Sequence, residues 1–433
     1  MITQLKCDLH HRIHNRLLLL SLLTSKSFTA AAGVAIMPIG YGAKSIGMLG
    51  TDMAFSDSPL SINNNPAGLT KVDGPALYLA LEPHLLTGLN YRDSLGNSQD
   101  SQLDSMLLVS LGWSKPLASA PNITVGLGLF AQGGVGYDYQ ELETTYGNRD
   151  ELSAMFGVFR FAPAIAWQAS DKLRFGLSAS INYAEAEQNI LPNTSDLATG
   201  FYGLALWDVG GTSFSWRGGV QYEITDTLHL GAAYGHSTEL KLDDGKASVN
   251  FEAIGIGRVN YQSAAIKGLS LPKEVGVGIA WQISPKLTIG ADINWYQWSK
   301  ALGEITTALS GPDNLLAPEH IVVVNDFGGQ DQFMQSIGLE YEYSDTTTIY
   351  SGINHVGYAV EKGASNPLNN LTAKYHLGGG IEHRINQHWQ TSIIFIANPE
   401  NSRKYTNTSL PLGSEAEVGF NSYQFVLELD YHW

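Results

Sequence analysis

Apolar and polar residues alternate through most of the chain, and a short pattern recurs within this alternation. It consists of an aromatic residue, a polar residue, any residue, Ser or Thr, Asp or Pro, any residue, Leu, any residue, an apolar residue and Gly. Full copies lie at 167–176, 222–231 and 281–290. Each copy reads as a strand with an aromatic residue near its end, a tight turn, and a second strand. The pattern predicts consecutive antiparallel hairpins.

The alternation gives each strand one apolar face and one polar or small face. Segments of this kind number about fourteen, an even number as outer-membrane barrels require. The expected fold is all-β: a transmembrane antiparallel β-barrel of about fourteen strands with a plug in its lumen. The strands are expected to begin near Pro75, Gln102, Asn122, Met155, Leu173, Ser213, Leu228, Leu271, Leu287, Gln332, Thr347, Thr372, Trp389 and Val418.

The turns near Ser170, Thr225 and Ser284 are short, whereas the connections between the hairpins are long and polar. This asymmetry is typical of bacterial outer-membrane barrels, whose short turns face the periplasm. Two of the long connections also contain apolar residues, which we interpret as a landing surface facing outward; ordinary loop packing is the alternative. Long loops are expected near 140–153, 190–212, 244–271, 300–331, 361–371 and 401–417.

The composition fits a barrel better than a soluble protein. Charged residues make up only 15 % of the 433 residues, while the mean hydropathy is −0.06. A wall with one face on lipid and the other on water has such an average. The formal charge of −16 argues against a nucleic-acid surface, which would be basic. No stretch approaches the ~20 apolar residues of a transmembrane helix, so any membrane span must consist of strands.

Residues 1–35 are expected to be a signal peptide. Basic residues precede a short apolar run at 17–23, and small residues offer cleavage after Ala32 or Ala35. Cys7, the only cysteine, lies in this leader, so the mature chain would contain no disulfide and no cysteine-based metal site. A disordered N-terminal tail is the alternative interpretation.

Residues 36–74, which we call the hatch, have neither a strand period nor a helix period. Glycines interrupt the segment repeatedly, and Pro66 pushes Asn65 away from the helical region. A barrel with an interior plug needs such a compact, irregular piece ahead of its strands. The alternative is a plain N-terminal loop with two turns. Residues 75–433 are then the transmembrane barrel.

The hatch resembles that of the FadL/TodX family, outer-membrane channels for long-chain fatty acids and aromatic hydrocarbons. The similarity rests on Gly-Tyr-Gly-Ala-Lys-Ser-Ile-Gly-Met at 40–48 and on Asn65, Pro66, Ala67 and Gly68. It continues in Leu-Pro-Lys at 271–273 with the strand that follows, and in the Trp-Tyr-Gln-Trp-Ser stretch at 295–299. The resemblance covers nearly all of the chain after the leader.

The resemblance implies passive uptake of long-chain fatty acids or other hydrophobic compounds across the outer membrane of a Gram-negative cell. In that family a shift of the hatch and a kink in the third strand let the substrate leave sideways into the bilayer. The candidate third strand here runs through 122–136, and Gly133, Gly134 and Gly136 indicate a kink or bulge. The hatch residues Asn65, Pro66, Ala67 and Gly68 are the other expected functional residues.

Two inward-facing arginines are candidates for the polar end of a fatty acid. Strand alternation turns Arg160 and Arg217 toward the lumen, because their neighbours along each strand are apolar. A buried guanidinium can bind a carboxylate through two charge-assisted hydrogen bonds. The alternative, which we favour for either residue taken singly, is an ion pair with a lumen acid such as Glu340, Glu382 or Glu428.

The C-terminal strand alternates up to its last residue, Trp433, with aromatic or aliphatic residues on one face. A final strand ending on an aromatic residue resembles the signal read by the barrel-assembly machinery, although the usual last residue is Phe. The expected partners are this machinery, outer-membrane lipid with lipopolysaccharide, and an apolar ligand. We expect a monomer that binds no nucleic acid.

Enzyme motifs are missing from the sequence. It contains no P-loop, no Gly-x-Ser-x-Gly and no His-Glu-x-x-His, and we expect neither an enzyme nor a cofactor or metal. Asp93, Asp100 and Asp104 are interpreted as a solvated acidic loop and not as an ion site. A hydrolase with distant catalytic residues is a minor alternative. A general porin, or a barrel that acts through its surface loops in adhesion, is the main competing function.

Overall fold

The computed structural model describes residues 33–369 and 373–433. The expected leader, with its apolar run and Cys7, therefore lies outside the described residues except for its last three positions. No helix in the part of the chain that is described is long and apolar enough to cross a membrane.

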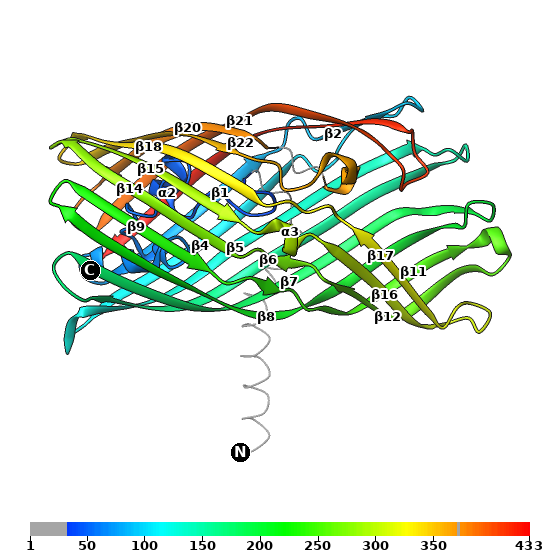
Figure 1. The fold of residues 1–433 in the computed structure, drawn as a ribbon, viewed down its shortest axis with the longest axis horizontal. Helices are drawn as coiled ribbons and strands as arrows, with labels where there is room; N and C mark the ends of the chain where they lie inside the picture. Colours follow the sequence, from blue (N-terminus) through cyan, green and yellow to red (C-terminus); the bar gives the residue numbers. More distant parts are fainter. Residues whose placement is uncertain (1–32, 370–372) are drawn as a thin grey trace, which may run out of the picture.

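Fourteen antiparallel strands form a closed barrel, as the sequence predicted (Figure 1). Each strand pairs with the next along the ring, and the ring closes between β1 and β22, where Ala76 lies opposite His432. The strands of the ring are β1 (Ala76–Leu85), β4 (Ser105–Leu117), β5 (Ala120–Glu143), β6 (Arg149–Gln168), β7 (Leu173–Asp196), β8 (Phe201–Thr225), β9 (Leu228–Gly235), β14 (Glu274–Ser284), β15 (Leu287–Tyr296), β18 (Gln332–Ser344), β19 (Thr347–Val356), β20 (Tyr375–Arg384), β21 (Trp389–Thr406) and β22 (Glu415–His432).

The two ends of the barrel differ in the way that the hairpins predicted. Turns of a few residues join the strands at one end, whereas longer connections with further strands extend the wall at the other, which we call the long-loop end (Figure 1). The additional elements there are β2 (Asn90–Asp93), β3 (Ser98–Asp100), β10 (Thr238–Glu239), β11 (Leu242–Phe251), η3 (Glu252–Ile254), β12 (Gly257–Lys267), β13 (Ser270–Leu271), α3 (Trp298–Ala301), β16 (Glu304–Pro312), β17 (His320–Asp326), η4 (Lys362–Ala364) and η5 (Pro367–Asn369).

Several segments expected to be loops are strands. The connections expected at 140–153, 190–212 and 401–417 shrink to short turns because β5 to β8, β21 and β22 continue beyond the apolar band. The loops expected at 244–271 and 300–331 contain β11, β12, β16 and β17. Beyond the membrane both faces of a strand can be polar, so backbone pairing continues where the period of two in the sequence has ended.

The outer and inner faces of the wall follow the alternation. Outward side chains such as Ile165, Trp167 and Leu177 are about half exposed, at 47 %, 48 % and 50 %. Their neighbours Ala166 and Ser178 are buried in the lumen. The outer face is therefore apolar and the inner face is small or polar, as a barrel in lipid requires.

The hatch lies inside the barrel (Figure 1). Its elements are the short helix α2 (Ala43–Gly47) and the 3₁₀ turns η1 (Pro59–Ile62) and η2 (Pro66–Lys71). Helix α2 lies against β19 to β22, and η2 against β5 to β8. Nearly every hatch residue is buried, including Ile46, Leu60 and Leu69 at 1 %, 0 % and 0 % exposure.

The glycine that ends each copy of the repeated pattern lies where the hatch touches the wall. A Cβ atom added at Gly176 would lie 2.1 Å from the Pro66 carbonyl carbon, and one at Gly231 would lie 1.9 Å from the Met53 oxygen. At Gly290 it would lie 2.1 Å from the ring of Phe55. The repeated pattern therefore also places glycines where the wall must leave room for the hatch.

Two adjacent glycines on β8 provide a matched test of this contact. A Cβ atom at Gly219 would lie 2.0 Å from Asn65 Oδ1, whereas one at Gly218 would meet no atom closer than 3.7 Å. We predict that Gly219→Val displaces the hatch and makes cells sensitive to a large polar antibiotic such as vancomycin, while Gly218→Val leaves them resistant. Equal resistance of both variants, with both barrels folded by heat-modifiability on gels, would contradict the assigned contact.

Candidate functional site

Three consecutive asparagines at the centre of the hatch are each held differently. The Asn65 side chain caps η2 by accepting from Ala67 N at 3.2 Å, and it donates to the carbonyl oxygens of Met53 at 2.7 Å and Val220 at 3.1 Å. Asn65 thus connects two parts of the hatch to β8. Pro66, Ala67 and Gly68 follow as the first turn of η2, with Gly68 packed against the Ser56 backbone.

Arg217 on β8 is paired with a wall carboxylate and also binds the backbone of Asn64. Its guanidinium forms a salt bridge with Glu274 of β14 and donates to the Asn64 carbonyl oxygen at 3.2 Å. The two side chains are only 9 % and 13 % exposed, so the pair is buried. Its partner is none of the acids expected from the sequence.

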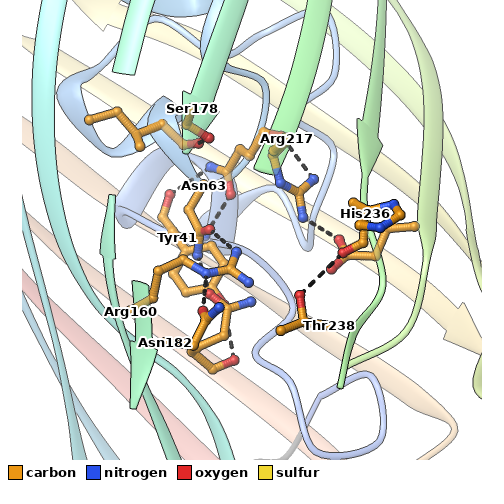
Figure 2. A network of polar contacts seen from close by, with 12 residues as sticks. Tyr41, Asn63, Arg160, Ser178, Asn182, Arg217, His236 and Thr238 are labelled. Carbon is orange, nitrogen blue, oxygen red and sulfur yellow. Dashed lines mark hydrogen bonds and ion pairs between the residues drawn. The ribbon is translucent and has the colours of Figure 1, made fainter. Parts of the chain in front are cut away.

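Arg160 on β6 binds Asn63, and its environment differs from that of Arg217. Its Nη1 donates to Asn63 Oδ1 at 2.6 Å, and its Nε donates to Asn182 Oδ1 at 2.8 Å (Figure 2). No carboxylate of the described residues lies within salt-bridge distance of this guanidinium. Arg160 is therefore a buried cation with amide partners alone.

Asn63 also binds β5, the third strand of the barrel. Its Nδ2 donates to Gln132 Oε1 at 2.7 Å, and the hydroxyl of Tyr41 donates to the Gln132 carbonyl oxygen at 3.2 Å. The Tyr41 ring also meets Phe130 edge to face, with 5.3 Å between ring centroids. Two parts of the hatch thus hold the same residue of β5.

Two wall carboxylates accept hydrogen bonds from the hatch backbone. Asp292 Oδ2 on β15 accepts from the amides of Asp52 and Met53, both at 2.8 Å, and Glu428 Oε2 on β22 accepts from Ala43 N at 2.9 Å. These bonds satisfy backbone donors that an irregular segment cannot pair within itself.

A hatch lysine supplies a further ion pair. Lys44 Nζ lies 2.7 Å from Asp57 and 3.1 Å from Glu340 of the wall. Burial alone would lower the pKa of Lys44, but the carboxylates of Asp57 and Glu340 outweigh it and hold that pKa above its ordinary value. Lys44 therefore stays charged and ties the hatch to β18.

The third barrel strand is irregular where the hatch touches it. The register of β5 against β6 shifts between Ala131 and Gly133, which marks a bulge. Gly134 N beside it donates to the Ile36 carbonyl oxygen at 2.8 Å, and a Cβ atom at Gly133 would lie 2.2 Å from that oxygen. Gly136 lies outside the bulge, paired regularly with Met155.

The wall is interrupted beside this bulge. The pairs between β4 and β5 end at Ser110 and Phe130, so residues 105–109 of β4 pair only with β1. Bonding to β5 resumes ahead of β4, where Gln102 N donates to the Asp138 carbonyl oxygen at 2.7 Å. We call this unpaired stretch the window; Met106, Leu108 and Ala131 form a buried apolar cluster along it.

A cavity of about 680 Å³ lies among the connections at the long-loop end. Apolar and aromatic residues form the largest group in its lining, and the charged residues among the described lining residues are Asp326 and Glu361. Apolar residues from the segments that the sequence marked as a landing surface contribute to it: Val249, Phe251, Leu309, Ile321 and Val323.

Asp93, one of the three aspartates considered for an ion site, holds a turn instead. Asp93 accepts hydrogen bonds from Leu95 N, Asn97 Nδ2 and Gly413 N at 2.8–2.9 Å, which fixes a turn between strands. Among the described residues, no group of three or more His, Cys, Asp or Glu side chains is arranged to hold a metal ion.

An apolar band facing lipid, a closed fourteen-stranded wall and a lumen filled by a bonded hatch define a plugged outer-membrane channel. The chain belongs to the outer-membrane transport protein family OMPP1/FadL/TodX, whose family model matches residues 22–393. It is therefore a transport protein for hydrophobic compounds in the Gram-negative outer membrane, and not an enzyme.

Solved structures share the fold at low sequence identity. The toluene transporter TodX of P. putida has a TM-score of 0.75 at 20 % identity, covering 91 % of this chain and 99 % of its own. The toluene transporter TbuX of Ralstonia pickettii gives 0.73 at 19 % identity, with the same coverage. A Pseudomonas aeruginosa FadL homologue gives 0.72 at 15 % identity, covering 92 % and 99 %. No curated protein sequence matches significantly.

Sequence reasoning missed the wall residues that hold the hatch, above all Gln132, Glu274 and Asp292. Glu274 and Asp292 are polar residues on inward positions of regular strands, so alternation places them in the lumen, whereas Gln132 is the unpaired residue of the β5 bulge. Nothing in the local sequence distinguishes such a residue from one that meets water. Their partners lie far away along the chain, 239 and 240 residues away in the case of Asp292.

The salt bridge between Arg217 and Glu274 allows a stability test. Because removing one partner leaves the other charge buried and unpaired, Arg217→Met should lower the unfolding free energy by about 3–5 kcal/mol. Adding Glu274→Gln to this variant should restore most of the loss. Urea titration of the protein in lipid vesicles measures both. Losses that simply add in the double variant would mean that the pair does not act as a unit.

Proposed function

We propose that this protein takes up long-chain fatty acids or other hydrophobic compounds by passive diffusion and releases them sideways through the window. The observation that carries this proposal is the unpaired stretch between β4 and β5, beside which the hatch forms hydrogen bonds with Gln132 and Gly134 of β5. An apolar molecule gains nothing from the aqueous periplasm, so an exit through the wall into lipid is the favourable route.

The route begins at the long-loop end, which we take to face outward. The apolar cavity of about 680 Å³ is large enough for a ligand of this class and lies within the usual range of ligand pockets. The ligand then moves into the lumen and displaces the first residues of the hatch. Release of Ile36 from Gly134 and of Tyr41 from Gln132 opens the window.

The two arginines take different parts in this proposal. The charge of Arg217 is balanced by Glu274, which favours a role in holding the hatch over one in binding a ligand. Arg160 has only amide partners, so an incoming carboxylate would compete with Asn63 for it. Arg160 is therefore the better candidate of the two for the head of a fatty acid, should the ligand be one.

The filled lumen speaks for this function over general diffusion. A porin needs an open aqueous channel, whereas hatch residues here bond to β5, β6, β8, β15 and β22. Assembly of a monomer by the barrel-assembly machinery through β22, with lipopolysaccharide around the rim, completes the proposal.

A disulfide cross-link across the window tests the exit route. Leu108 and Ala131 lie in one apolar cluster on its two sides. We predict that a disulfide in Leu108→Cys/Ala131→Cys lowers uptake of radiolabelled palmitic acid and toluene about tenfold, and that reduction restores it.

The matched control places the disulfide in the regularly paired part of the same two strands, as Lys115→Cys/Val125→Cys, where the residues lie opposite each other. This staple should leave uptake unchanged. Full uptake with the window verified as stapled would show that the ligand leaves by another route.

A further inference from the structure

Two neutral polar side chains on the inner wall near the window have no hydrogen-bond partner among the residues that the structure describes. His84 on β1 is 0 % exposed, and neither ring nitrogen is bonded; Asn398 on β21 is 3 % exposed, and neither its amide nitrogen nor its amide oxygen is bonded. Most buried polar atoms in proteins have partners, and each exception calls for an explanation. An unpaired buried polar group destabilises a fold, so leucines at these positions would serve packing better.

The two side chains belong to one patch of the inner wall, which we call the polar pair. In the strand register His84 lies opposite Gln424 of β22, and Asn398 lies opposite Ser422 of the same strand. Strand β22 thus lies between His84 and Asn398. Their opposite residues on β22 are two positions apart, so the two side chains are offset by one inward-facing position. All four residues are buried on the lumen side.

His84 is the member of the polar pair that borders the window, and Asn398 lies two strands further from it. On its other side His84 lies opposite Met106 of β4, which belongs to the apolar cluster along the window. Buried apolar residues also flank the pair along the chain: Ile396 lies two residues before Asn398, and Leu86 lies two residues after His84. A ligand that leaves through the window therefore passes an apolar surface with two free hydrogen-bonding groups.

We propose that the polar pair binds the uncharged oxygen of a long apolar molecule, a hydroxyl or carbonyl group, as the molecule enters the window. A neutral imidazole offers one donor and one acceptor, and the amide offers two donors and one acceptor. A hydroxyl satisfies groups of both kinds, and a carbonyl oxygen accepts from both residues. A pure hydrocarbon satisfies neither.

The charges nearby disfavour an ionised carboxylate at this position. The nearest charged residues along β1 and β21 are Glu82 and Glu400, both acidic, and Glu82 is buried with its Oε1 unbonded. A carboxylate ion buried without a paired cation is costly, and neither strand supplies a cation next to the polar pair. The polar pair is therefore distinct from Arg160, which suits a carboxylate.

The inference rests on the proposed uptake function and is tested with ligands of equal carbon number. Radiolabelled 1-dodecanol, dodecane and dodecanoate are equilibrated with the full-length protein in lipid nanodiscs, with empty nanodiscs as the blank. His84→Leu/Asn398→Leu should weaken dodecanol binding about tenfold and leave dodecane and dodecanoate unchanged. Ser336→Ala, which removes another buried and unbonded polar group from β18, should change none of the three.

A stability measurement keeps the outcome interpretable. Because leucine removes unpaired polar atoms, the double variant should unfold at a higher urea concentration than the wild type, which excludes misfolding as the cause of lost binding. Unchanged dodecanol binding in a folded double variant would overturn the inference, and so would an equal loss for all three ligands. Failure of the wild type to take up either dodecane or dodecanol would instead contradict the proposed uptake function itself.

Discussion

The hatch plugs the barrel lumen, and hydrogen bonds to side chains of the wall hold this irregular segment in place. A segment with one short helix and two 3₁₀ turns cannot pair most of its own backbone groups, and inside a barrel it has little water to pair them with. Asp292 and Glu428 accept from hatch amides, while Arg217 and Asn354 donate to hatch carbonyls at 3.2 and 3.1 Å. Polar residues on the inner face of the wall thus supply partners to the hatch backbone.

These bonds are directional, and this has a consequence for transport. Hydrophobic packing alone would let the hatch slide, but each hydrogen bond fixes one atom against one strand. The bonds to β5 fall on Gln132, the unpaired residue of the bulge, and on Gly134, two residues further along the strand. The hatch therefore holds the wall at the place where its strand pairing is interrupted.

Much of this architecture could be predicted from the sequence. The period of two, the turn residues near Ser170, Thr225 and Ser284 and the even number of segments gave the closed barrel, because membrane strands must hide one face from lipid. The Asn65-Pro66 turn marked the hatch. The extended strands at the long-loop end were missed, since β11 and β17 pair through their backbones without an alternating pattern of side chains.

The partners inside the lumen could not be predicted from the sequence. Alternation put Arg160 and Arg217 on the inner face, but the choice of Asn63 for one and Glu274 for the other depends on how the hatch lies in the barrel. The window was equally hidden: a glycine-rich strand indicates a bulge, whereas the loss of pairing with β4 is a property of two strands together.

Single-channel conductance in planar bilayers tests the central claim most directly, comparing the wild type with a variant that lacks residues 36–70. If the hatch closes the barrel through the bonds described, the wild type should conduct almost no ions and the shortened variant should open a large, steady pore. Equal conductance of the two, with the variant verified as a folded barrel, would contradict the account.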